Sequence, residues 1–137
     1  MGVIIKSKNH CIDIRSINNL RLKISELMGK EIFEHYKNLE NGWLISGKEK
    51  EKFFEEYNKR TFDIREKYNV PDGIIQFLYA DRGSISPEDC AQIWEVIKDY
   101  DDKILYGYPR LPFCARFKDI KEVIRDCIEN HCKLKWF

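Results

Sequence analysis

The sequence lacks a long apolar run, an excess of either charge and a paired cysteine motif. No hydrophobic stretch approaches the roughly 20 residues that cross a bilayer, and the apolar residues 3–5 are too few for the core of a signal peptide. We therefore expect a cytoplasmic protein that has no membrane partner.

The charges nearly cancel, because 24 lysines and arginines face 23 aspartates and glutamates and leave a net charge of +1. This balance gives no long-range attraction to nucleic acid, so direct nucleic-acid binding is not expected, and it also argues against a carboxylate-covered mimic of DNA. The length of 137 residues and a hydrophobic content of 43% suit one core, and we predict a single domain over residues 1–137.

Cysteine is present in an odd number, without any C-x-x-C pair. The five cysteines are Cys11, Cys90, Cys114, Cys127 and Cys132. This pattern argues against a disulfide framework and favours free thiols buried in the core. Cys127 and His131 would share one face of a helix, but no second pair completes a zinc site. We predict neither a metal ion nor a cofactor.

Helical periodicity dominates the middle of the sequence. Apolar residues recur at helical spacing from Leu20 to Leu39, with Gly29 placed to break that helix in two. A second helix over residues 48–68 should bury Phe53, Phe54, Tyr57, Ile64 and Tyr68. Residues 74–79 are interpreted as a further helix. Ser86 before Pro87 predicts a capped helix that ends near residues 101–102, and a last helix is expected over residues 117–130.

Short strands are expected at both ends of the chain. Residues 3–5 are apolar, Ile12 and Ile14 resume the strand after a polar turn, and residues 134–137 should pair near the first strand. Asn41-Gly42 is a turn signal, and residues 43–45 fit either a strand or a buried connection. Together these elements predict an α+β fold, with four or five amphipathic helices packed on a small sheet that includes the N- and C-terminal strands.

Residues 81–89 have the glycine, isoleucine and acid spacing of the second half of a calcium-binding loop. If Gly83 held the sixth place of that loop, the earlier ligand positions would fall on Leu78, Ala80 and Arg82, which offer no carboxylate. The segment is therefore interpreted as a plain turn into the capped helix.

Acidic residues crowd the expected end of this helix, at Asp99, Asp101 and Asp102, where the helix dipole disfavours negative charge. Neutralisation by a neighbouring base is favoured over a magnesium or partner-binding site. The neighbouring bases are Lys98, Lys103 and Arg110.

The next segment mixes aromatic rings with guanidinium groups, at Tyr106, Tyr108, Arg110, Phe113 and Arg116. Such a mixture can anchor a protein interface, hold a nucleotide by stacking and phosphate binding, or staple a loop to its own core, and the staple is the leading interpretation. For a binding function, this segment from Tyr106 to Arg116 and the acidic turn from Asp99 to Asp102 are the expected contact surface, with Asp101 and Asp102 as its acidic contact residues.

The usual catalytic patterns are missing from the sequence. It has no phosphate-cradling glycine loop, no zinc-protease helix motif and no recognisable nucleophile with its base. His10, His35 and His131 lie in separate segments. We therefore expect a protein that is not an enzyme and has no catalytic residues.

Several stretches that span most of the chain form a recognisable set. They are residues 1–3 and 7–9, Leu20-Arg21 with residues 34–36, residues 77–79 with Asp81, Gly83 and Cys90, residues 96–102, 106–108 and 117–119, Asp126-Cys127 and Trp136. In these stretches the chain resembles a family of small uncharacterised proteins from phages, prophages and related mobile elements of Gram-positive bacteria. Residues 15–17 depart from the family, which has a glycine-rich tyrosine turn at this place.

The family has no known activity, so the resemblance implies a genomic neighbourhood and no mechanism. By analogy with other small proteins of mobile elements, it suggests a non-enzymatic phage-type inhibitor that binds a bacterial host defence protein inside the host cell. One alternative is sequestration of a nucleotide immune signal, with Arg110 and Arg116 on phosphate, tyrosines on the base and an oligomer that encloses the ligand. Another alternative is an immunity protein that neutralises a co-encoded toxin.

Overall fold

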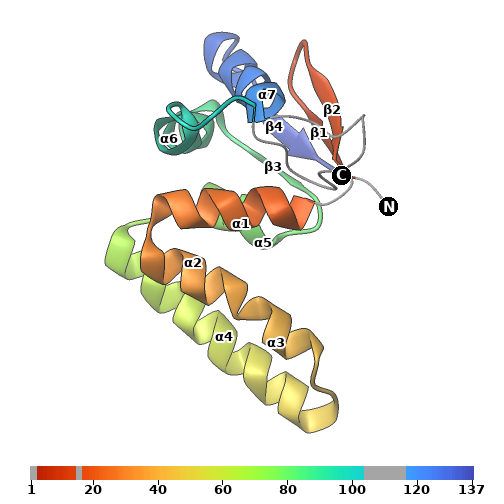
Figure 1. The fold of residues 1–137 in the computed structure, drawn as a ribbon, viewed down its shortest axis with the longest axis vertical. Helices are drawn as coiled ribbons and strands as arrows, with labels where there is room; N and C mark the ends of the chain where they lie inside the picture. Colours follow the sequence, from red (N-terminus) through yellow and green to blue (C-terminus); the bar gives the residue numbers. More distant parts are fainter. Residues whose placement is uncertain (1–2, 15–16, 104–116) are drawn as a thin grey trace.

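A computed structural model describes residues 3–14, 17–103 and 117–137. Its strands are β1 Val3–Lys6, β2 Cys11–Ile14, β3 Gly83–Ile85 and β4 Leu134–Trp136. Its helices are α1 Ile17–Met28, α2 Lys30–Lys37, α3 Leu39–Trp43, α4 Gly47–Tyr68, α5 Asp72–Tyr79, α6 Pro87–Ile97 and α7 Phe117–Glu129. These elements confirm the predicted α+β fold, in which helices pack with a sheet that includes the N- and C-terminal strands (Figure 1).

The sheet is antiparallel, with the strand order β2-β1-β4-β3. The predicted pairing of the two ends of the chain is confirmed, because Ile5 of β1 lies opposite Trp136 of β4. Strand β3, which the sequence indicated as a plain turn, forms one edge of the sheet. Alternate residues of each strand face the core, and Ile5, Leu134 and Trp136 are almost completely buried there.

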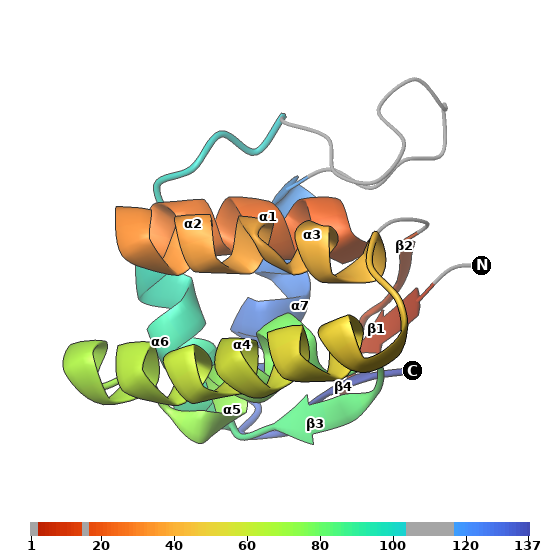
Figure 2. The ribbon, with the colours of Figure 1, turned by 90° about the horizontal axis from the view of Figure 1, so that it is seen from below.

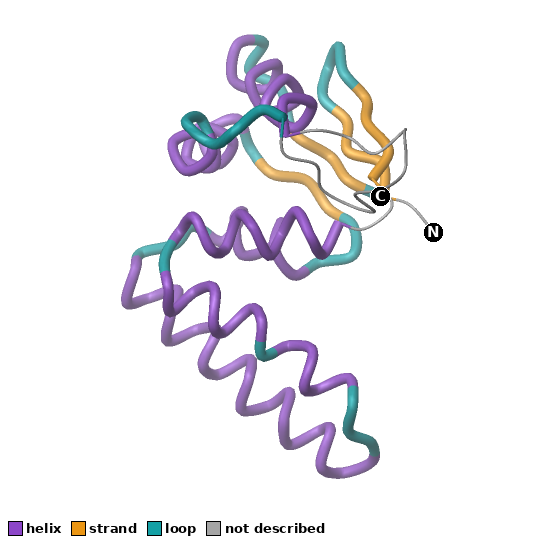
Figure 3. The backbone as a smooth tube through the Cα atoms, viewed as in Figure 1, coloured by secondary structure: helices purple, strands orange, loops and turns teal. Residues whose placement is uncertain are grey.

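Helix α7 lies along the core side of the sheet, with α6 beside it, while α1 and α5 cross next to them (Figures 1 and 3). The strong amphipathic pattern of α7 accounts for this position, because one of its faces is apolar. The core-facing residues of α7 include Phe117, Ile120, Val123, Ile124 and Cys127, each with no exposed surface. The predicted cap of α6 is also confirmed, since the Ser86 hydroxyl accepts a hydrogen bond of 3.1 Å from the Asp89 backbone N–H.

Helices α2, α3 and α4 form a hairpin-like extension that we call the helical arm. Figure 2 shows α4 running alongside α2 and α3, and Figure 1 shows the arm extending away from the sheet. The arm begins at Gly29, whose φ of 152° is rarely adopted by other residues, and this glycine separates α1 from α2 as expected. Among the described residues, no helix has the length and apolar character needed to span a bilayer.

The α3 region corrects two predictions. Asn41 and Gly42 lie inside α3 and do not form a turn. A Cβ added to Gly42 would lie 2.4 Å from the Phe53 ring, so this glycine serves the close approach of α3 to α4. Trp43 and Leu44, expected in a strand or a buried connection, instead lie exposed at the end of this short helix.

Two further details of the helices differ from the predictions. Tyr68 was expected on the buried side of α4, but its side chain is exposed and its hydroxyl donates a hydrogen bond to the Glu31 carboxylate on the surface. Helix α6 ends at Ile97, earlier than residues 101–102, because Lys121 of α7 binds the backbone carbonyl groups of Lys98 and Tyr100 that follow it.

Candidate functional site

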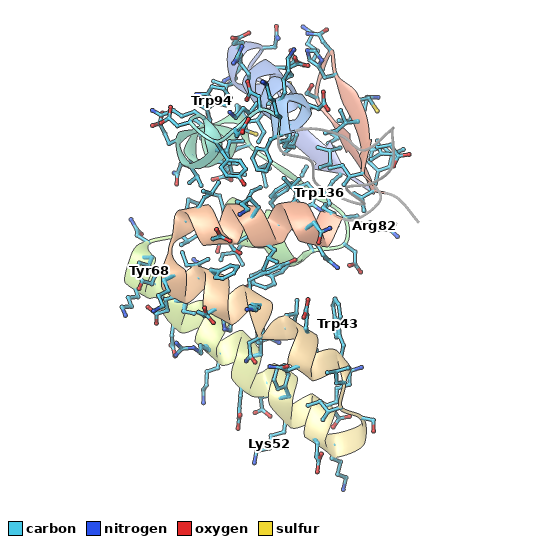
Figure 4. The ribbon with its side chains drawn as sticks, viewed as in Figure 1. Trp43, Lys52, Tyr68, Arg82, Trp94 and Trp136 are labelled. Carbon is cyan, nitrogen blue, oxygen red and sulfur yellow. The ribbon has the colours of Figure 1, made fainter. Side chains whose placement is uncertain are left out.

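The arm ends in two exposed apolar side chains at the junction of α3 and α4. Trp43 is 56% exposed and Leu44 is 85% exposed, and we call this pair the arm tip. Successive helical residues are about 100° apart, so while Gly42 faces Phe53, Trp43 turns away from that contact. Figure 4 shows the Trp43 side chain projecting from α3 on the side away from α4.

A polar groove lies along the arm. It has a volume of about 460 Å³, and it is lined from α2, α3 and α4 by residues that include Glu34, His35, Glu40, Asn41 and Arg60. Asn41 of this lining precedes Trp43 by two residues in α3, so the two side chains leave the helix on different sides. The arm therefore carries both exposed apolar side chains and a polar groove, and protein interfaces use surfaces of both kinds.

A buried aromatic cluster holds the base of the arm together, and sequence reasoning missed it. The His35 ring of α2 stacks on Tyr57 of α4 with 4.0 Å between ring centroids, and its Nε2 lies 2.6 Å from the Thr61 hydroxyl. The Tyr57 hydroxyl donates to the His35 carbonyl oxygen at 2.9 Å and lies 3.2 Å from the hydroxyl of Tyr79 in α5. Burial, with a smaller contribution from the Arg60 charge, lowers the pKa of His35 to about 4.

This lowered pKa predicts that the protein loses stability in mild acid. His35 titrates at about 4 when folded and near 6.5 in its ordinary state, so between these values the unfolded chain takes up a proton that the folded chain does not. The stability that neutral His35 contributes to the folded protein is therefore fully present above pH 6.5 and is lost as the pH falls towards 4. From pH 7 to pH 5 we expect a loss of about 2 kcal/mol in the free energy of unfolding.

Urea unfolding of the native chain and of His35→Gln, at several pH values between 5 and 7, measures this loss. Most of the pH dependence should disappear in His35→Gln and persist in His10→Gln, which changes an exposed histidine of the β1–β2 turn. An unchanged pH dependence in His35→Gln would show that another group titrates.

The acidic turn after α6 is held by a lysine that sequence reasoning did not identify. The Lys121 ammonium group of α7 lies 2.6 Å from the Asp102 carboxylate, and this contact holds the pKa of Asp102 below its usual value. Lys98 forms an ion pair with Glu95 instead. The Lys103 backbone N–H donates a hydrogen bond of 2.9 Å to the Asp101 carboxylate, but the Lys103 ammonium group does not pair with it. The interpretation of Asp102 as neutralised is supported, but the base is Lys121.

The remaining predicted contact residues lie outside the described residues. They are Tyr106, Tyr108, Arg110, Phe113 and Arg116, and their binding role stays a prediction. Asp101 and Asp102 are both exposed, so they remain accessible to a partner.

The described cysteines confirm the prediction of buried free thiols only in part, and Cys114 lies outside the described residues. Cys90 and Cys127 are buried without a disulfide, whereas Cys11 is exposed and Cys132 is half-buried. The contact with Cys90, together with burial, raises the pKa of the Cys127 thiol, so it stays protonated at neutral pH and is a poor nucleophile or metal ligand. His131 is exposed on the turn after α7. Within the described ranges, no three His, Cys, Asp or Glu residues are placed to share a metal ion.

A second candidate site lies where the β1–β2 turn meets the turn after α7. The Asp126 carboxylate of α7 accepts hydrogen bonds from the Ser7 hydroxyl at 2.6 Å, from the Asn9 backbone N–H at 2.7 Å and from the Asn9 and Asn130 amides. These bonds hold the pKa of Asp126 well below its usual value, with Ser7 as the largest contributor. We call this arrangement the Asp126 staple, because it fixes the two turns side by side.

Beside the Asp126 staple lies a pocket of about 550 Å³ that we call the lysine pocket. Its lining includes Lys6 and Lys135 on the sheet, Lys8 in the β1–β2 turn, Lys133 before β4, and Phe137. Lys6 follows the buried Ile5, and Lys135 lies between the buried Leu134 and Trp136, so both lysines point from the side of the sheet that α7 does not cover.

Comparisons with known proteins found no matching family model, no similar curated protein and no similar solved structure.

Proposed function

We propose that this chain is a non-enzymatic phage-type inhibitor that binds a bacterial host defence protein through the arm tip. The exposure of two adjacent large apolar side chains, Trp43 and Leu44, is the observation that carries the proposal. Single exposed apolar residues are common on protein surfaces, but two large ones next to each other in the chain expose more apolar area at one place than isolated residues do. Tryptophan is also among the residues that contribute most to protein interfaces.

The local structure favours a preformed binding surface. Gly42 lets α3 pack directly on Phe53 and Phe54 of α4, so the helix end that carries the arm tip is fixed before any partner binds. The polar groove along the same arm supplies further hydrogen-bonding groups for a partner. A preformed surface loses little conformational entropy on binding, which favours affinity.

The chemistry of the described residues favours binding over catalysis. His35 is buried and neutral at pH 7, and its ring Nε2 is hydrogen-bonded to the Thr61 hydroxyl. The buried thiol of Cys127 is held in its protonated form. The host setting follows from the family resemblance, and by analogy it favours a defence protein as the partner.

The arm tip can be tested by replacing its residues with serine. The double variant Trp43→Ser and Leu44→Ser should fold, because both side chains are exposed, and should lose binding to a partner captured from a bacterial host by at least about a hundredfold. Phe62→Ser is a matched control, because Phe62 on α4 has the same exposed fraction of 56% as Trp43. Binding is measured by calorimetry with the partner after its identification by mass spectrometry.

Plaque counts on a defended host strain test the function itself. Expression of the native chain or of Phe62→Ser should restore phage growth, and expression of the arm-tip variant should not. Equal binding or equal plaque counts for the native chain and the arm-tip variant would contradict the proposal.

A further inference from the structure

We propose that the lysine pocket binds a nucleotide, with its lysines on the phosphate groups and Phe137 against the base. The pocket lies on the sheet, apart from the arm, and the inference does not depend on the proposed function. Its volume of about 550 Å³ lies within the range of small-molecule sites.

The positive charge of the lysine pocket has no carboxylate partner among the described residues. Lys6 and Lys135 are direct partners in the β1–β4 register, and like charges at such positions repel each other. Lys8 and Lys133 add two further ammonium groups to the same pocket. Within residues 3–14, 17–103 and 117–137, none of these lysines forms an ion pair with a carboxylate. An anionic ligand would relieve the repulsion that the folded chain tolerates here.

The extent of the positive charge favours a small anion. The positive charge is local, because Asp13 lies opposite Ile4 on the same side of the sheet and the whole chain has a net charge of only +1. An extended nucleic-acid strand would need a continuous basic path, and the described residues of this face do not provide one, because Asp13 interrupts it. Several clustered ammonium groups instead match the compact, dense charge of a polyphosphate, which lysine binds as a point charge.

An exposed aromatic ring, that of Phe137, lies beside the lysines in the same pocket. Phe137 is 58% exposed, and its backbone pairs with Ile4 through hydrogen bonds of 2.8 and 3.0 Å, so the position of the residue is fixed while its ring is free to contact a ligand. A base stacks on such a ring without sequence-specific hydrogen bonds. The Asp126 staple similarly fixes the turn that carries Lys8.

Calorimetric titrations with ATP and with inorganic tripolyphosphate test the site. We expect both probes to bind, and the double variant Lys6→Gln and Lys135→Gln to bind both about tenfold more weakly, since each lysine supplies a charge-assisted contact. The matched control changes Lys48 and Lys52, two exposed lysines of α4, to glutamine and should retain the native affinity. Phe137→Ala should weaken the binding of ATP by about tenfold and leave the affinity for tripolyphosphate unchanged, because only ATP has a base that stacks on the ring.

Thermal unfolding without ligand gives an independent measurement. Removing the repulsion between Lys6 and Lys135 should raise the Tm of the Lys6→Gln and Lys135→Gln variant by about 1–3 °C, so weaker binding cannot be attributed to misfolding. The proposal is overturned if the native chain binds neither probe, if the two lysine pairs behave alike, or if an eight-residue oligothymidylate or an oligoglutamate peptide binds more tightly than ATP.

Discussion

Replacing Trp136 with alanine should lower the free energy of unfolding by about 4 kcal/mol, the largest effect we expect for a single substitution. Trp136 is 1% exposed and lies in β4, between the neighbouring strands β1 and β3. Its ring meets Phe77 edge to face with 5.2 Å between centroids, and its indole N–H donates a hydrogen bond of 3.0 Å to the Ala80 carbonyl oxygen. Alanine would leave a cavity where the sheet meets α5.

Urea unfolding of Trp136→Ala and Trp136→Phe separates the two contributions of this residue. The phenylalanine variant keeps much of the ring packing but loses the indole hydrogen bond, so it should be destabilised by about 1–2 kcal/mol. A loss below about 1 kcal/mol in Trp136→Ala would mean that β4 does not occupy the centre of the fold.

Replacing Asp126 with alanine should lower the free energy of unfolding by about 3 kcal/mol, the second largest effect that we expect. The carboxylate joins the β1–β2 turn to the turn after α7. Its removal would leave the Ser7 O–H donor with only the longer contact of 3.4 Å to the His10 carbonyl oxygen, and the Asn9 backbone N–H without its acceptor. Because the Ser7 side chain is buried, water cannot fully replace that acceptor.

Asp63→Ala is the control for Asp126→Ala, because Asp63 is exposed on α4 and its loss should change stability by less than about 0.5 kcal/mol. Chemical denaturation of both variants measures the difference. If both variants are equally stable, the Asp126 staple does not hold the turns in solution.

Local signals were sufficient to predict most of the helices and the terminal strands. Ser86 and Pro87 set the start of α6 through interactions that span a few residues, and Gly29 ends α1 through its own backbone conformation. Gly42 gave the wrong prediction because glycine favours both turns and close helix packing, and only the position of Phe53 decides between them. Strand β3 was missed because its three residues are too few for an alternating pattern.

The candidate sites depend on contacts between segments that are distant in the sequence. His35, Tyr57 and Tyr79 come from three helices, and Lys121 reaches Asp102 across 19 positions, so neither arrangement has a local signature. The lysine pocket does have a sequence pattern, because Lys6 and Lys8 are two residues apart near one end of the chain and Lys133 and Lys135 are two residues apart near the other. Since the terminal strands were expected to pair, these lysines could have been placed together from the sequence.

Hydrogen–deuterium exchange of the chain, alone and in complex with the captured host partner, tests the central proposal most directly. If the arm tip is the docking surface, partner binding should slow exchange most strongly in residues 41–46 at the α3–α4 junction. Slower exchange confined to the sheet or to the acidic turn at residues 99–103, with no change at the arm tip, would contradict the proposal.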